Sequence, residues 1–154
     1  RQRFWALVSF EGGRIGVVLP RSVFSVKGSE EFRWELLREA NHIDLVTLQN
    51  TAHWVFNIES RYTFALVSIE RRINPKSSVK LSGPYNSLPS FETRKKNVVA
   101  SFSGKEVLSW NDSASLPLLT YPTDKSIEVL KRIKFLLIIL ISRVYSGSVN
   151  PSPT

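Results

Sequence analysis

Three short apolar runs and one helix pattern fill the first 72 residues, and the segments between them restrict the fold. The runs are Ile15–Leu19, Ile43–Leu48 and Tyr62–Ile69. The helix pattern lies between the first two, which predicts that these two strands are parallel. The connection Gln49–Arg61 is too short for a crossover helix, so the last two runs are predicted to form an antiparallel hairpin. Together these elements indicate an α/β fold.

The helix pattern is expected to begin after Ser29, whose hydroxyl can cap the first turn. Apolar residues then recur at helical spacing at Phe32, Leu36, Leu37 and Ala40, which predicts one buried face. The solvent face would carry Arg33, Glu35, Arg38 and Glu39. The preceding run IGVVL has apolar residues on both faces, which is typical of a strand buried on both sides in a parallel sheet.

The composition changes after residue 72, and we divide the chain there. Proline and glycine punctuate a serine-rich stretch, which predicts a loop or domain boundary. Residues 73–123 are expected to form a linker or extension, with one or two short strands in Phe91–Trp110. A helix is predicted for 124–141 and a disordered tail for 142–154. Residues Phe135–Ile141 are apolar on all sides, as in a buried helix.

Composition excludes several kinds of chemistry. The chain has no cysteine, which excludes disulfides, thiolate zinc sites and cysteine nucleophiles. His42 and His53 are the only histidines and no carboxylate cluster accompanies them, so we expect no metal site. The longest apolar run is far below the roughly 18 residues of a membrane span, so no membrane partner is expected. A chain without methionine that begins with Arg1 suggests a segment of a longer gene product.

The net charge of +8 is unevenly distributed along the chain. The first 72 residues carry 10 basic and 8 acidic side chains, and the remaining 82 carry 11 and 5. A basic surplus favours association with polyanions, of which nucleic acid is the commonest. The run Arg94-Lys95-Lys96 is short, and we interpret it as a solvated turn rather than a binding patch.

The strongest chemical signal is the aromatic segment of the predicted hairpin connection. Trp54 and Phe56 are two residues apart, so in an extended segment they would face the same side. They can cap the edge of the core, or they can form a platform that stacks on an unpaired base for about 1–3 kcal/mol per base. Arg61 could hold a phosphate or support the turn.

Three stretches resemble one large family. They are GGRIGVVLPRSVFS (Gly12–Ser25), SEEFRWELL (Ser29–Leu37) and HWVFNIESRYTFALVSIERR (His53–Arg72). They are similar to the later part of the catalytic domain of N6-adenine-specific DNA methyltransferases, closest to the fused type IIG restriction–modification enzymes. The resemblance covers residues 1–72 well and continues weakly to Arg132. It implies the C-terminal half of a Rossmann-like S-adenosylmethionine-dependent sheet, followed by an irregular extension.

The family's mechanism assigns candidate residues. These enzymes flip the target adenine out of double-stranded DNA, and an aromatic residue on the hairpin packs against the base. The resemblance makes Phe56 that base-stacking residue, in one wall of the adenine pocket. Further DNA-contact candidates are Trp54, Arg61, Arg71 and Arg72.

The chain also departs from the family pattern. It has no Asn-Pro-Pro-aromatic tetrad, and Gly83-Pro84-Tyr85-Asn86 is only superficially similar to one. The glycine-rich loop and acidic residue that bind S-adenosylmethionine are absent too. We therefore expect this chain to contain no catalytic residue and to be inactive by itself, within a cytoplasmic enzyme. The alternative is a noncatalytic basic α/β module that binds DNA non-specifically. An Asn-Pro-Pro-aromatic tetrad encoded upstream would favour the methyltransferase.

Overall fold

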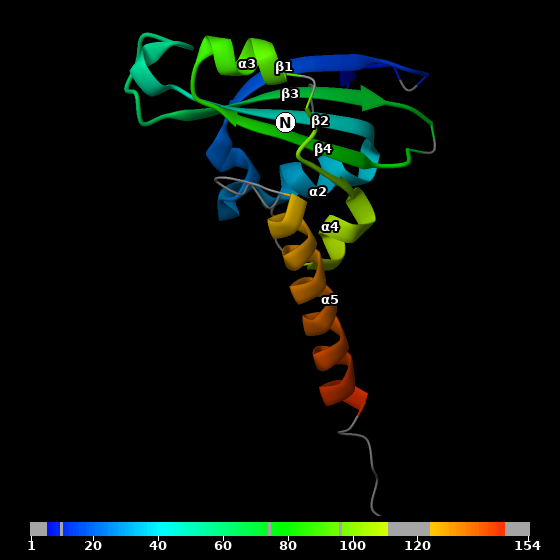
Figure 1. The fold of residues 1–154 in the computed structure, drawn as a ribbon. Coiled ribbons are helices and arrows are strands. Elements are labelled where there is room, and N and C mark those ends of the chain that lie inside the picture. Colours follow the sequence, from blue (N-terminus) through cyan, green and yellow to red (C-terminus); the bar gives the residue numbers. More distant parts are fainter. Residues whose placement is uncertain (1–5, 10, 74, 96, 111–123, 147–154) are drawn as a thin grey trace, which may run out of the picture. The chain divides into compact units, whose positions relative to one another are not determined.

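The computed structural model describes residues 6–9, 11–73, 75–95, 97–110 and 124–146. The chain forms two compact units, Arg1–Tyr121 and Pro122–Thr154. The first unit contains the sheet and most of the helices, and the second contains a single long helix (Figure 1).

The first unit is a mixed α/β structure built on an open five-stranded sheet. Its strands are β1 (Arg14–Pro20), β2 (Ala40–Gln49), β3 (Thr63–Arg71), β4 (Ser78–Tyr85) and β5 (Ala100–Ser103). Their order is β1-β3-β2-β4-β5 (Figure 1). β3 is antiparallel to both of its neighbours, β2 and β4 are parallel, and β4 and β5 are antiparallel. The predicted α/β class and the predicted hairpin are confirmed.

The first two predicted strands differ from the prediction in one respect: they are not neighbours in the sheet. β1 and β2 run in the same direction, as predicted, but β3 lies between them. β1 is hydrogen-bonded only to β3, and exposed and partly buried residues alternate along it. Gly16 and Val18 lie on the exposed side, so the prediction that this strand is buried on both sides is wrong. A β-branched run cannot distinguish an edge strand from a central one.

The core lies on one face of the sheet. Ile43 and Leu45 of β2, Ala65 and Val67 of β3, and Val79 of β4 are all buried. These residues alternate with less buried ones, as expected for a sheet with a single covered face. The helices α2 (Glu30–Glu39) and α4 (Gly104–Trp110) lie on one side of the sheet, and α3 (Leu88–Arg94) lies at the other (Figure 1).

Helix α2 departs from two predictions. The Ser29 side chain makes no capping hydrogen bond, although the helix begins directly after it. Arg33 was expected in solvent but is 1% exposed. Its Nη1 donates to the carbonyl oxygens of Val23 and Val26, each at 2.8 Å, beside the short helices η1 (Arg21–Phe24) and η2 (Lys27–Ser29). Burial lowers the pKa of Arg33, and the nearby Glu30 carboxylate opposes this effect.

The serine-rich stretch after residue 72 is part of the sheet. β4 occupies Ser78–Tyr85 and pairs with β2, so the prediction of a loop or boundary over this stretch is wrong. Val79 and Leu81 are buried between serines, and Tyr85 is buried at the end of the strand. One short strand, β5, lies within Phe91–Trp110 as expected. The polar residues that alternate with the buried ones along β4 are typical of a loop, so composition did not indicate this strand.

The second unit is the helix α5 (Asp124–Ser146). It begins where predicted, but it extends past residue 141 into the segment expected to be disordered. Residues 147–154 of that expected tail lie outside the described residues. The expectation of a buried apolar segment is wrong, because its side chains are exposed: Phe135, Leu136, Leu137, Leu140 and Ile141. None of the described helices is long and apolar enough to cross a membrane.

Candidate functional site

One edge of the sheet collects the connections that follow three strands. β1, β2 and β4 run in the same direction, so their carboxyl ends lie at this edge. We call it the carboxyl edge. The helix η1 follows β1, residues 50–62 follow β2, and α3 follows β4 after two residues. In open α/β sheets this is the edge where ligands commonly bind.

Asn50 organises the connection between β2 and β3, which we call the Asn50 loop (residues 50–62). Its side chain is fully buried. Oδ1 accepts the backbone N–H groups of Val55 and Phe56 at 3.2 and 3.0 Å. Nδ2 donates to the carbonyl oxygens of Phe56, Ile58 and Glu59 at 2.9, 3.1 and 3.4 Å. One neutral amide therefore satisfies backbone groups along the middle of the loop.

The start of the Asn50 loop has an unusual backbone. Ala52 and His53 have φ values of 53° and 58°, in the left-handed region that non-glycine residues rarely adopt. The His53 N–H donates to the Asn50 carbonyl at 3.0 Å, and His53 Nδ1 lies 2.6 Å from the Ile58 carbonyl oxygen. Such a conformation persists where surrounding contacts impose it, so the loop has a defined shape.

Phe56 lies on this loop with its ring partly exposed. Its centroid is 4.9 Å from that of Phe64 on β3, and the rings are at 73°, an edge-to-face arrangement. Phe56 is 42% exposed. Tyr62, 6.5 Å from Phe64 between centroids, is also exposed. The Phe56 ring is thus supported on one side and open to solvent on another, and the flanking strands are paired.

Trp54 packs elsewhere. Its Nε1 donates to the Gln49 carbonyl at 2.6 Å, and its ring centroid lies 6.3 Å from Phe91 of α3. Phe91 in turn packs edge-on against Tyr85 at the end of β4, at 5.7 Å. Because residues 54–56 are not extended strand, Trp54 and Phe56 do not form one shared platform. Trp54 instead fastens the Asn50 loop to α3.

The three predicted arginines divide between the two edges of the sheet. Arg61 is at the carboxyl edge, with its side chain 87% exposed and its Nη2 3.3 Å from Glu59. Arg71 and Arg72 lie at the end of β3, at the opposite edge. Arg71 is buried and pairs with Glu39 at 3.1 Å, so it is not the surface residue that we expected. The structure therefore brings Arg61, but neither Arg71 nor Arg72, to the Phe56 loop.

Glu70 is the centre of the charges at that opposite edge. Its carboxylate accepts from Asn41 Nδ2 at 2.9 Å, from Arg72 at 2.8 Å and from Arg14 at 3.4 Å. The hydrogen bonds from Asn41 and Arg72 lower the pKa of Glu70 from 4.5 to about 2. Glu70 thus joins two guanidinium groups and one amide in a structural cluster at this edge.

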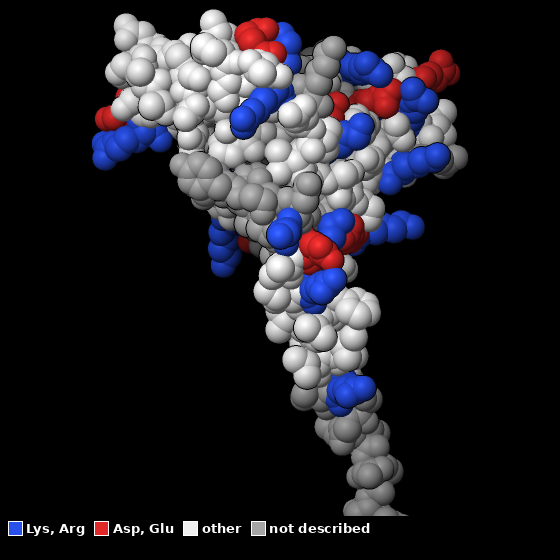
Figure 2. Space-filling model, in the orientation of Figure 1, with Lys and Arg blue, Asp and Glu red and all other residues white. Residues whose placement is uncertain are grey.

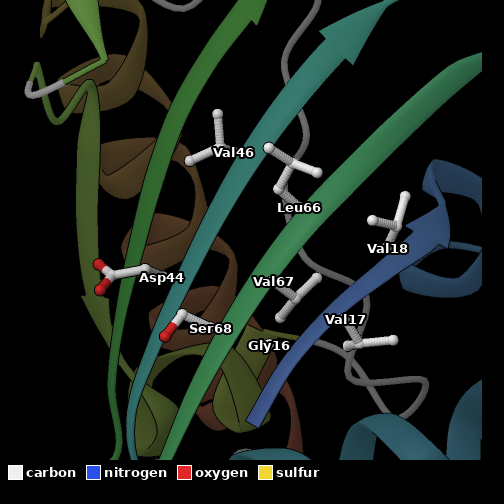
Figure 3. A pocket seen from close by; sticks show the side chains of 8 residues that line it. All are labelled: Gly16, Val17, Val18, Asp44, Val46, Leu66, Val67 and Ser68. Atoms are coloured by element: carbon white, nitrogen blue, oxygen red, sulfur yellow. The ribbon is translucent and has the colours of Figure 1, made fainter. Parts of the chain in front are cut away.

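The face of the sheet opposite α2 and α4 contains an open hollow of about 330 Å³ on β1, β3 and β2 (Figure 3). Its lining is mostly apolar: Gly16, Val17, Val18, Asp44, Val46, Leu66, Val67 and Ser68. Asp44 is the one acidic residue among those that line the hollow, and its Oδ1 lies 3.0 Å from His42 Nε2. Within the described part of the chain, no group of three or more His, Asp or Glu could hold a metal ion.

Charges of both signs lie on the face seen in Figure 2. Figure 2 shows Lys and Arg distributed over one face with acidic side chains among them. Neither a scan against protein-family models nor a search of curated proteins finds a match to this chain. The fold and the site define a mixed α/β protein with an aromatic loop at the carboxyl edge of its sheet.

Sequence reasoning missed Asn50 and the position of α3. An asparagine directly after a strand favours side-chain hydrogen bonds to the following turn, and this was the available signal for Asn50. The packing of Phe91 on Trp54 joins residues far apart in the sequence. No local pattern encodes such a contact.

Proposed function

We propose that this chain is the C-terminal part of the catalytic domain of an S-adenosylmethionine-dependent, N6-adenine-specific DNA methyltransferase of a restriction–modification system. The proposal starts from the resemblance of Gly12–Ser25, Ser29–Leu37 and His53–Arg72 to that family. In it, the Asn50 loop forms one wall of the pocket for an adenine flipped out of the duplex. As part of a restriction–modification system, the enzyme is proposed to act in the cytoplasm.

The observation that supports it most is the setting of Phe56. The ring is 42% exposed, yet it is backed by Phe64 and its own backbone N–H and C=O are bonded to Asn50. A ring held in this way loses little conformational entropy when a flat ligand stacks on it. Stacking of one base on an aromatic side chain contributes about 1–3 kcal/mol.

The arrangement of the sheet is compatible with this role. A strand, a helix and a second strand in the same direction are followed by the antiparallel β3, and the Asn50 loop lies at the carboxyl edge. We propose that this unit is the C-terminal half of a Rossmann-like methyltransferase sheet. Trp54 then acts by fastening the loop to α3, and Arg61 is the remaining DNA-contact candidate of the arginines predicted from the sequence.

The proposed role is confined to binding the base. S-adenosylmethionine supplies the methyl group in this family, but this chain has no glycine-rich cofactor loop and no Asn-Pro-Pro-aromatic tetrad. The residues present therefore do not fit the cofactor, and no methyl-transfer step is assigned to them. What Phe56 can do is cover one face of an extrahelical adenine and exclude water from it.

The test is methyl transfer by the complete reading frame that encodes this chain. Incorporation of labelled methyl groups from S-adenosylmethionine into duplex DNA is expected, with the label at adenine N6. Phe56→Ala should lower kcat/KM about 5- to 150-fold, the equivalent of about 1–3 kcal/mol of stacking. Val18→Ala, an exposed apolar residue of β1, is the matched control and should leave kcat/KM unchanged. Absence of adenine methylation, or equal kcat/KM for Phe56→Ala and wild type, would overturn the proposal.

A further inference from the structure

We infer that the last turn of α3 and the residue after it, Arg94 and Lys95, bind the phosphate backbone of the DNA strand that passes the Asn50 loop. The inference adds a phosphate-binding surface to the proposed function and rests on it only for the identity of the stacked base. From the sequence alone, the run Arg94-Lys95-Lys96 was expected to be a solvated turn. Its third member, Lys96, lies outside the described residues.

Aromatic packing fixes α3 beside the loop. Phe91 of α3 is 6.3 Å from Trp54 of the Asn50 loop and 5.7 Å from Tyr85 of β4, between ring centroids. The hydroxyl of Tyr85 donates to the carbonyl oxygen of Arg94. Burial raises the pKa of this hydroxyl. The last turn of α3 is thus tied both to the loop and to the sheet.

The two basic side chains extend from this fixed turn. Lys95 Nζ lies 5.9 Å from the centroid of the Phe91 ring, the ring that packs on Trp54. The Arg94 residue is exposed, although its carbonyl oxygen is bonded to Tyr85. The cations are therefore presented by an ordered backbone next to the loop that carries Phe56. Cations at a helix C-terminus are also stabilised by the helix dipole.

Acidic side chains of α3 and of the Asn50 loop are already paired with cations. Glu92 accepts from Lys95 Nζ at 2.6 Å, and Glu59 pairs with Arg61 at 3.3 Å. Both pairs are exposed, and such pairs contribute about 0–1 kcal/mol, so a phosphate can compete for the cation. None of the ion pairs found among the described residues involves Arg94. The local balance is positive.

A nucleic-acid strand matches this pair of features. A base that stacks on Phe56 carries a phosphate on each side, and phosphate contacts fix the register of a strand without reading its sequence. Arg94 provides a planar, permanently charged fork and Lys95 a flexible point charge, both of which suit phosphate oxygens. The surface therefore selects for a phosphodiester chain and not for a particular base.

The experiment measures DNA binding of the full chain by fluorescence anisotropy as salt concentration varies. The probes are a labelled single-stranded oligonucleotide and the corresponding duplex. Arg94→Ala/Lys95→Ala should reduce the slope of log K against log salt by about 1–2, since each lost phosphate contact changes it by about 0.7–0.9. The control Lys125→Ala/Arg132→Ala, on α5, removes the same charge and should leave the slope near that of the wild type.

Two results would overturn the inference. One is an equal loss of slope in both double variants, which would mean that net charge alone governs binding. The other is the absence of salt-dependent binding by the wild-type chain. Circular dichroism should show that both variants fold, since all four side chains are exposed.

An abasic oligonucleotide separates this inference from the proposed function. The effect of Arg94→Ala/Lys95→Ala should persist on an abasic strand, because the phosphates remain. The effect of Phe56→Ala should require the base. If Phe56→Ala binds both strands like the wild type while Arg94→Ala/Lys95→Ala loses slope, the stacking role fails and the phosphate surface stands. If Phe56→Ala weakens binding only where the base is present while Arg94→Ala/Lys95→Ala keeps the wild-type slope, the phosphate surface alone is rejected.

Discussion

The two ends of β2 each hold a buried or partly buried asparagine, and they use it differently. At the amino end, Asn41 donates to Glu70, a carboxylate that also accepts from Arg14 and Arg72. At the carboxyl end, Asn50 bonds only to the backbone of its own loop. The first end is closed by charges that satisfy one another. The second is closed by a neutral amide.

This difference explains why the aromatic and basic groups near Asn50 remain accessible. A charged cluster requires the side chains around it as partners, as Glu70 requires two arginines. A single amide that satisfies the backbone leaves the side chains of Phe56 and Arg61 exposed. The amino end can thus stabilise the sheet while the carboxyl end presents groups to a ligand.

The largest expected effect comes from removing the amide at the carboxyl end. Asn50→Ala should lower the free energy of unfolding by about 2–4 kcal/mol, because it leaves several loop N–H and C=O groups without partners. Asn41→Ala, the matched change at the other end, should cost about 1 kcal/mol, since Glu70 keeps its arginines. Urea denaturation of both variants measures the two values.

Hydrogen exchange then localises the Asn50 effect. The amides of Val55 and Phe56 donate to Asn50 and should lose protection in Asn50→Ala, while those of β2 and β3 keep theirs. Equal stability of the two variants, or unchanged protection at Phe56, would contradict the role given to Asn50.

A smaller effect is expected from acid at the amino end. The folded-state pKa of Glu70, about 2, is below its ordinary value of 4.5, so its contribution to stability is complete above pH 4.5. That contribution should be lost as the pH falls from 4.5 through 2. Glu70→Gln should remove this part of the pH dependence, which denaturation at a series of pH values measures. The protection of the Phe56 amide should not follow the same curve, because Asn50 does not titrate.

Local patterns predicted the elements and not their partners. The runs and the helix over residues 14–71 were found because apolar periodicity reports which face of an element is buried. The same patterns failed at β4, where the buried Val79 and Leu81 lie between serines. They also failed at Arg33, which is buried because its guanidinium donates to the carbonyl oxygens of Val23 and Val26. Both failures have one cause: the partner that makes these residues part of the core lies elsewhere in the chain.

The candidate site was predicted in the same partial way. Residue type singled out the aromatic segment and Arg61, and the family resemblance selected Phe56 within it; Phe56 and Arg61 both lie exposed on the loop. Arg71 was misplaced because an arginine at the end of a strand is typical of a surface charge, whereas its side chain is buried and pairs with the partly exposed Glu39. Asn50, which determines the geometry of the loop, has a short polar side chain that gives no periodic signal.

The most direct test of the central claim observes the Phe56 ring itself. Aromatic proton NMR of the full chain, assigned with Phe56→Leu, is followed during titration with a short single-stranded oligonucleotide that carries one adenine. Stacking predicts an upfield ring-current shift of the Phe56 protons, which should be absent when the adenine is replaced by an abasic site. Identical Phe56 shifts with both oligonucleotides, or no shift while DNA is bound, would contradict a base-stacking role for this residue.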